Sequence, residues 1–172
     1  MTRAADTSIV DANRHDAQSD AAAGLVDFIS FAIGGDQYGV DIMSVREIKE
    51  WSKVTKLPEQ PEYVSGVLNL RGVMVPVIDL RCRFGAGLTE CSPTHIVIVV
   101  QINGRQVGLL ADRVLDIVSF DTAKVQPVPR TAQATAKFLS GLVTHDDTMI
   151  ALIDLRHLLE HDGESASGGL AA

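Results

Sequence analysis

The sequence predicts an all-β protein built from two similar five-stranded barrels, and three features of the chain support this prediction. Val, Ile and Leu dominate the apolar residues, which make up 46% of the 172 positions. The apolar runs are short and are broken by 14 Gly and 6 Pro, a mixture that favours strands and tight turns over a helical bundle. The third feature is an internal repeat, in which one supersecondary unit occurs twice along the chain.

The predicted strands follow one another through tight turns. Gly34-Gly35-Asp36 and Asn103-Gly104 are clear turn signals, because Gly and Asn tolerate the positive φ angles of hairpin turns. The strand-like runs are residues 25–33, 38–42, 73–80, 94–102, 107–111 and 148–155. Only two short helical stretches are expected, after Asp79 and Asp154, where each carboxylate is placed to cap a first helical turn.

The repeat emerges when the chain is aligned with itself, first at an offset of 69 residues and then, after a loop of different length, at 75. It pairs Gln37 with Gln106, Gly39 with Gly108, Val45 with Val114, Glu47 with Asp116, Ile48 with Ile117, Ser65-Gly66 with Ser140-Gly141, Met74 with Met149, and residues 78–81 with 153–156. Each copy holds about five strands, and closing so small a sheet into a barrel removes its exposed edges. We therefore expect one domain over residues 25–162, with barrel halves at about 25–92 and 93–162.

The chain ends and the overall charge limit the location and the partners. Residues 1–24 are polar and Ala-rich and residues 163–172 are mostly small, so both are predicted to be disordered tails. A net charge of −7 without a basic run argues against nucleic-acid binding. The sequence shows neither a leader-like start nor a run of 18 apolar residues, and two Cys are too few for a disulfide framework. We expect a cytoplasmic protein that does not insert into the membrane.

Several residues invite a catalytic or metal-binding interpretation that their surroundings do not support. Asp79 and Asp154 could mimic the paired carboxylates of an aspartic protease, but both lie at strand ends within Ile-Asp-Leu-Arg instead of in an exposed turn. Cys82, Cys91 and His95 lack a fourth zinc ligand and a close Cys pair, which favours two buried thiols. The sequence has no phosphate-binding glycine motif or nucleophile elbow, so we expect no catalytic residue, metal or cofactor.

One loop differs between the two copies of the repeat. The first copy has Asn69-Leu70-Arg71-Gly72 where the second has Thr144-His145-Asp146-Asp147, so the repeat itself does not require Arg71. Arg71 offers a planar fork for a carboxylate, and Gly72 lets the chain turn or lets a partner approach. Two interpretations stay open: Arg71 anchors a partner protein, or it braces the loop through an internal salt bridge, for example to Glu47.

Four segments, in this order, carry a resemblance to a known family: FISFAIGGDQYGVDIMSVREI, GVLNLRGVMVPVIDLRCRFG, HIVIVVQINGRQVGLLADRVLDI and FLSGLVTHDDTMIALIDLRHLL. Together they resemble the CheW family of bacterial chemotaxis coupling proteins from about residue 26 to residue 159, and GVLNLRG followed by PVIDLR is the most specific stretch. The resemblance implies two SH3-like five-stranded barrels around a shared hydrophobic core. It leaves open whether the two halves exchange strands.

The resemblance also implies a function. Members of this family are non-enzymatic adaptors that bind the regulatory domain of the CheA histidine kinase and the cytoplasmic tip of methyl-accepting chemoreceptors, in arrays under the membrane. By position in the motifs, the coupling residues fall on Val45, Glu47, Gly66, Arg71 and Gly72. Val67 is expected to add apolar wall to a groove between the barrels, because a receptor helix binds by laying its apolar stripe into such a groove.

There are two rival functions, one within the binding proteins and one from a different class. The chain could serve a chemosensory pathway other than the flagellar one, since the polar loop at residues 145–148 leaves the preferred receptor open. It could also be a regulatory fragment of a kinase, because the kinase's own regulatory domain has the same fold in this family. The absence of a phosphoacceptor helix and of a nucleotide-binding block from the sequence favours an isolated adaptor.

Overall fold

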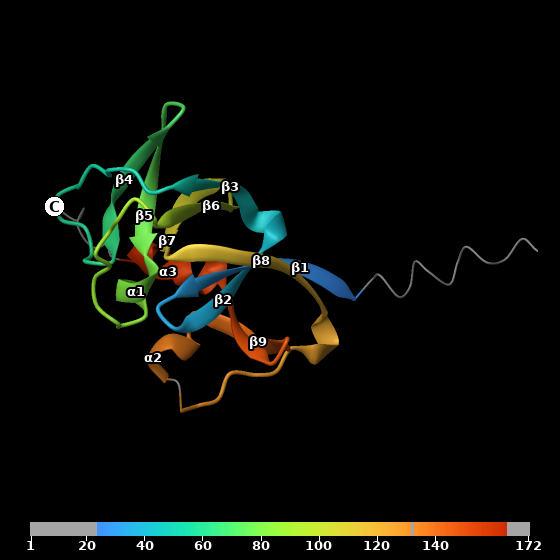
Figure 1. Ribbon diagram of the computed structural model, residues 1–172. Helices are drawn as coiled ribbons and strands as arrows, with labels where there is room; N and C mark the ends of the chain where they lie inside the picture. Colours follow the sequence, from blue (N-terminus) through green and yellow to red (C-terminus); the bar gives the residue numbers. More distant parts are fainter. Residues whose placement is uncertain (1–23, 132, 165–172) are drawn as a thin grey trace, which may run out of the picture.

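The computed structural model describes residues 24–131 and 133–164, which form strands joined by tight turns and a few short helices (Figure 1). The first strands are β1 (Leu25–Ile33), β2 (Asp36–Asp41), β3 (Val45–Glu50), β4 (Val64–Leu70) and β5 (Val73–Asp79). The others are β6 (Ile96–Ile102), β7 (Arg105–Ala111), β8 (Arg113–Asp121), β9 (Leu139–His145) and β10 (Thr148–Ile153). The helices are α1 (Leu80–Arg83), α2 (Gln133–Ala136) and α3 (Leu155–Glu164), with 3₁₀ turns η1 (Ile42–Ser44) and η2 (Thr122–Lys124).

The strands form two five-stranded sheets, which confirms the predicted all-β class. We call β3-β6-β7-β5-β4 the central barrel and β8-β1-β2-β10-β9 the terminal barrel, each in sheet order. Each barrel has one further β-bridge. In the central barrel, Thr55, after β3, pairs with Val67 of β4; in the terminal barrel, Gln126, after β8, pairs with Leu142 of β9. These bridges curl each sheet towards closure and protect its edges.

The two sequence halves exchange strands, so a boundary near residue 92 does not separate the barrels. β1 and β2 come from the first half but lie in the terminal barrel, while β6 and β7 come from the second half and lie in the central barrel. Two parallel pairings, β10 with β2 and β5 with β7, join strands from different halves. The expectation of one barrel in residues 25–92 and another in 93–162 is therefore wrong, because each barrel closes only with strands of the other half.

Three apolar clusters hold the domain together. The largest lies between the barrels and contains buried residues of both, among them Phe31, Val40, Ile98 and Leu109. Val75, Val97 and Leu110 belong to the cluster inside the central barrel. Val118, Phe120, Val143, Ile150 and Leu152 form the cluster inside the terminal barrel. The barrels thus share a hydrophobic core, as the resemblance implied.

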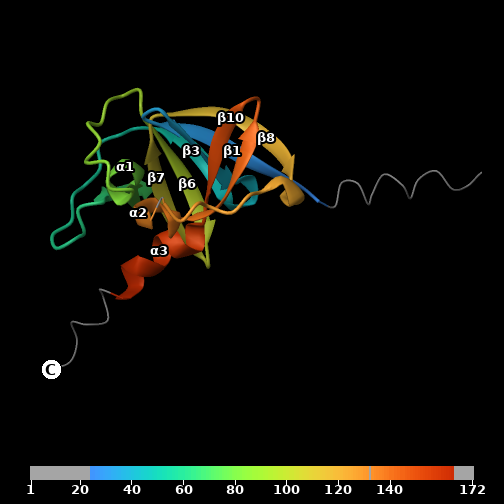
Figure 2. The ribbon, with the colours of Figure 1, turned by 90° about the horizontal axis from the view of Figure 1, so that it is seen from below.

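Arg83 lies where the two copies of the repeat meet. Its guanidinium carbon is 3.9 Å from the ring centroid of Tyr63 and 4.7 Å from that of Phe138, and these two residues are equivalent at the offset of 75. Arg83 Nη2 also donates to the carbonyl of Leu158, which is its own repeat equivalent, at 3.3 Å. Figure 2 shows α1, α2 and α3 gathered on the side of the strands where these contacts form.

Asp79 and Asp154 cap helices, as predicted. Asp79 is 2% exposed and accepts from the Cys82 amide at 3.3 Å, and it also accepts from the amide and the hydroxyl of Thr89 at 2.7 and 2.6 Å. Asp154 accepts from the amides of Arg156 and His157 at 3.0 and 3.2 Å. α3 runs through Glu164, so residues 163 and 164, assigned by the sequence to a disordered tail, are helical. The rest of both predicted tails, residues 165–172 and 1–23, lies outside the described residues.

Gly66 and Gly141, equivalent in the repeat, lie where the chain passes over a barrel strand. A Cβ on Gly66 would be 2.5 Å from the Thr55 carbonyl oxygen, and one on Gly141 would be 2.4 Å from Val125 Cγ1. Both separations are shorter than real Cβ contacts, so no other residue fits without moving the bridge that helps close the barrel. The repeat keeps these glycines for packing.

We expect Gly66→Ala to lower the free energy of unfolding by about 1–3 kcal/mol, the usual effect of forcing an extra methyl into a packed site. Gly35→Ala is the matched control, because a Cβ there meets no atom within 4 Å. Denaturant titration followed by circular dichroism measures both. Equal stability of the two variants would contradict the packing role of Gly66.

A second prediction concerns pH. Burial alone would raise the pKa of Asp154, but the hydrogen bonds and charge of His157, with the amide of Arg156, bring it below the ordinary 3.8. Because the folded pKa lies below the unfolded one, Asp154 stabilises the fold above about pH 3.8 and loses this contribution as pH falls through the folded pKa.

We therefore expect Asp154→Ala to be about 1 kcal/mol less stable than the unmodified chain at pH 7, as for other helix caps, and this difference to shrink in acid. Urea titrations at pH 7, pH 3 and pH 2 measure it, with the exposed Glu50→Ala as control. A difference that stays constant down to pH 2 would show that the carboxylate is not the stabilising group.

Candidate partner-binding surface

Arg71 and Gly72 form the two-residue turn between β4 and β5. Their φ angles are 52° and 85°, both in the left-handed region, as a type I′ hairpin requires. The Asn69 side-chain oxygen accepts from the Gly72 amide at 2.8 Å and fixes the turn. Gly72 thus serves the turn, and Arg71 is held at the tip of the hairpin.

The turn brings Arg71 to β3. Arg71 Nη2 lies 2.8 Å from Glu47 Oε2, and the two side chains are 83% and 24% exposed. An ion pair this exposed contributes only about 0–1 kcal/mol to stability. A guanidinium carries five N–H donors, so most of those of Arg71 face solvent and can bind a partner. The internal salt bridge expected with Glu47 is present and leaves the side chain accessible.

The equivalent turn of the terminal barrel has the same shape and opposite charge. Asp146 and Asp147 have φ angles of 48° and 61°, and His145 Nε2 lies 3.3 Å from an Asp146 carboxylate oxygen. The asymmetry noted in the sequence therefore lies in the side chains alone. One barrel presents a cation at its β4–β5 turn, and the other presents two carboxylates at its β9–β10 turn.

The other predicted coupling residues lie deeper. Val67 is 7% exposed and its backbone exchanges hydrogen bonds of 2.8 and 3.0 Å with Thr55, while Gly66 is buried beneath the same segment. Val45 begins β3, is half-buried and packs against the shared core, with a bulge between it and Glu47. Glu47, Arg71 and Gly72 therefore come together at the surface, whereas Gly66 and Val67 shape the strand below.

Sequence reasoning missed the apolar residues beside this turn. Val73 and Met74, which follow Gly72 directly, are 50% and 56% exposed, and Ile48 on β3 is 42% exposed. The repeat carried a signal, because it keeps Ile48 as Ile117 and Met74 as Met149, which are also more than half exposed. Exposed apolar residues mark a contact surface only where they form a contiguous patch, so these positions are candidates for contact with a partner.

Cys82, Cys91 and His95, the possible zinc ligands in the sequence, do not come together around one site. Cys82 is half-buried and Cys91 is exposed, so the expectation of two buried thiols is wrong. Desolvation and the negative charge of Asp79 raise the pKa of both thiols, which favours their protonated form. His95 instead contacts Ser92 and Asp112, and residues 24–131 and 133–164 contain no group of three or more His, Cys, Asp or Glu suited to a metal.

Comparison with known proteins assigns the chain to a family. A family model described as a CheW-like domain matches residues 27–163. The chain belongs to this CheW-like family. A relative named as a probable chemotaxis protein CheW, from Rhizobium etli, is 39% identical over 142 residues, covering 81% of this chain and 92% of the relative. The chemotaxis protein CheW of Klebsiella aerogenes is 36% identical, covering 79% and 82%.

A solved structure agrees with the CheW-like fold. The scaffolding protein TtCheW from Thermoanaerobacter tengcongensis superposes with a TM-score of 0.72 at 38% identity, covering 78% of this chain and 88% of that one. Among the residues that the structure describes, no helix combines the length and the apolar content needed to span a bilayer.

Proposed function

We propose that this CheW-like protein is a cytoplasmic chemotaxis adaptor that couples methyl-accepting chemoreceptors to a CheA-type histidine kinase by binding both. The names of its relatives support a role in chemotaxis and in scaffolding. The observation that carries the proposal is the exposed Arg71, held at a rigid turn that the terminal barrel repeats in shape but not in charge. A feature kept in one copy only points to a specific partner.

The proposed role needs no chemistry from the adaptor. The two carboxylates that could have formed a catalytic dyad are occupied as caps, Asp79 by Cys82 and Thr89 and Asp154 by Arg156 and His157. The signal would pass as a coupling free energy between two binding sites: binding of one partner would stabilise the arrangement of the adaptor that binds the other partner more tightly.

A groove between the barrels is where a helical receptor tip would bind. A cavity of about 540 Å³ is lined by residues of both barrels, including Phe28 and Leu155 on apolar walls and Ser44, Asn103 and Arg156 on polar ones. An amphipathic helix binds such a groove through its apolar stripe. Ser44 directly precedes Val45, the first residue of β3, so the groove adjoins the start of this strand. Glu47, in the same strand, pairs with Arg71.

The kinase would then contact exposed barrel-end turns such as the one at Arg71. Each contact is modest, but holding two partners in one array raises their effective concentration and stabilises the whole assembly. Under this proposal the adaptor lies at membrane-associated receptor arrays without inserting into the bilayer.

We expect Arg71→Ala to fold normally and to weaken binding of the kinase regulatory domain about tenfold, because the ion pair stabilises little while a lost interface anchor costs about 1–2 kcal/mol. Isothermal titration and thermal melting measure the two effects. Arg130→Ala, which removes another exposed arginine, is the control. An unfolded Arg71→Ala protein would make Arg71 a structural residue. A variant that folds and binds as tightly as the control would remove Arg71 from the interface.

The proposal as a whole is tested by co-sedimentation. The purified chain, mixed with a receptor tip and the kinase regulatory domain, should pellet with both. A protein that binds neither partner is not this adaptor. Binding to receptors of another chemosensory system, with no affinity for flagellar ones, would favour the rival pathway.

A further inference from the structure

Within the described residues, the chain crosses between the two barrels at two points. The first crossing is η1, between β2 of the terminal barrel and β3 of the central barrel. The second is the single residue Asp112, between β7 and β8. The offset of 69 residues makes Met43 of η1 and Asp112 equivalent, yet their surroundings are opposite. Met43 is 82% exposed, whereas the Asp112 side chain is 24% exposed and held from several sides.

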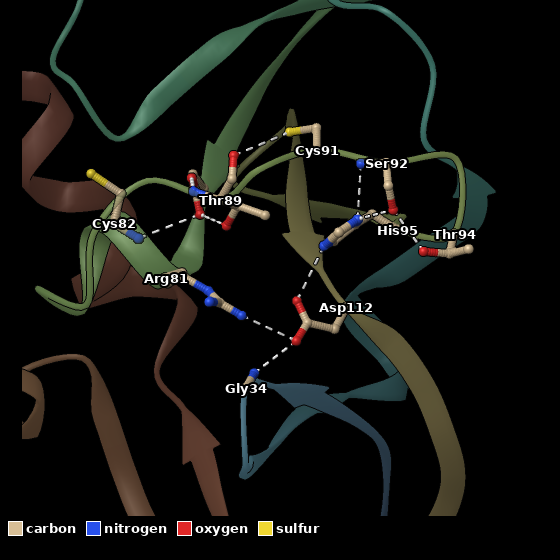
Figure 3. A network of polar contacts seen from close by, with 10 residues as sticks. Gly34, Arg81, Cys82, Thr89, Cys91, Ser92, Thr94, His95 and Asp112 are labelled. Atoms are coloured by element: carbon tan, nitrogen blue, oxygen red, sulfur yellow. Dashed lines mark hydrogen bonds and ion pairs between the residues drawn. The ribbon is translucent and has the colours of Figure 1, made fainter.

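Asp112 is the centre of a polar network that we call the clasp: Gly34, Arg81, His95 and Asp112 (Figure 3). One carboxylate oxygen accepts from the Gly34 amide at 2.7 Å and from Arg81 Nη2 at 3.3 Å. The other lies 3.4 Å from His95 Nε2. The Asp112 amide also donates to the carbonyl of Ala32 at 3.0 Å.

The clasp ties elements of both barrels to one carboxylate. Ala32 lies near the end of β1 and Gly34 in the turn between β1 and β2, in the terminal barrel. Arg81 lies in α1 and His95 precedes β6, both on the side of the central barrel. The His95 ring is itself oriented, because the Ser92 amide donates to Nδ1 at 3.0 Å and leaves Nε2 to face Asp112. Hydrogen bonds to a charged group are stronger than neutral ones, so this joint resists sliding of the barrels.

Strand β1 runs from the clasp to the first crossing, η1. Ala32 is paired with Arg113 beside the clasp, and Phe28 is paired with Asp41 beside η1. Four residues of strand separate the two ends by roughly 13 Å. The inter-barrel cavity is lined by Phe28, Asp41 and Ser44. The groove therefore lies between the barrels at the η1 end of β1, away from the clasp. A small rotation about the clasp would change the width of the groove.

We propose that the Asp112 clasp fixes the angle between the barrels and thereby sets the width of the groove that receives a partner helix. Asp112 is then a positioning residue, which acts on binding without touching the partner. The inference rests on the proposed adaptor function for its consequence, but the barrel angle is a property of the chain alone.

The test compares the full chain with Asp112→Ala, which removes the carboxylate, and Asp112→Asn, which keeps an acceptor for Gly34 but loses the charge. Asp116→Asn is the control, because the side chain of Asp116 accepts from the Ile117 amide of its own strand and, within the described part of the chain, from no residue of the other barrel. Residual dipolar couplings of backbone amides, fitted separately for each barrel, report the angle between them. Titration with a soluble receptor-tip hairpin reports the affinity.

We expect one common alignment of the barrels in the unmodified chain and the control, and a changed or averaged angle in Asp112→Ala. The affinity for the hairpin should fall about three- to tenfold, within the range of about two- to thirtyfold by which residues modulate coupling from a distance. For Asp112→Asn we expect a barrel angle and an affinity between those of the unmodified chain and Asp112→Ala, because the hydrogen bond from Gly34 survives.

An unchanged barrel angle in Asp112→Ala overturns the inference, and a changed angle with full affinity overturns its link to binding. If Asp112→Ala does not fold, Asp112→Asn and Arg81→Gln decide the matter, and unchanged angles in both overturn it. Failure of the unmodified chain to bind the hairpin would count against the proposed function, while the dipolar couplings would still test the clasp.

Discussion

Phe31, Ile98 and Leu109 are fully excluded from water at the seam between the barrels, and they come from strands of both. Burying one such side chain is worth about 1.5–3 kcal/mol, so neither barrel could leave this face exposed. The two barrels therefore exist as one domain. The position of every surface element, from the Arg71 turn to the inter-barrel groove, depends on how this core is packed.

The duplication shows which features the fold requires and which are free to change. Gly66 and Gly141, like Asp79 and Asp154, are kept in both copies because backbone packing and helix capping demand them. Arg71 against Asp146 and Met43 against Asp112 differ between the copies, so the repeated unit by itself requires none of these side chains. The surface chemistry proposed for partner binding lies in the second kind of position.

Local pattern was enough to predict β1, β2, β5, β6, β7 and β10, the turns after β1 and β6 and the caps, and it offered the Glu47–Arg71 pair as one of two interpretations, since each depends on a few neighbouring residues or on one complementary charge. It missed β3, β4, β8 and β9 as strands. It could not show that β1 pairs with β8, because alternation identifies a strand but not its neighbour in the sheet. It also placed Val67 at a groove wall, although the segment at Thr55 covers it. The exposure of Val73 and Met74 likewise depends on tertiary packing.

The exchange of strands imposes an order on biosynthesis. The central barrel is one uninterrupted stretch, from β3 to β7, so all of its strands are available once β7 has left the ribosome. β1 and β2 emerge earlier, yet their outer partners β8 and β10 are made last. This hairpin, with its apolar side chains, must therefore wait as an incomplete sheet, which makes the N-terminal hairpin the segment most in need of chaperone protection in the nascent chain.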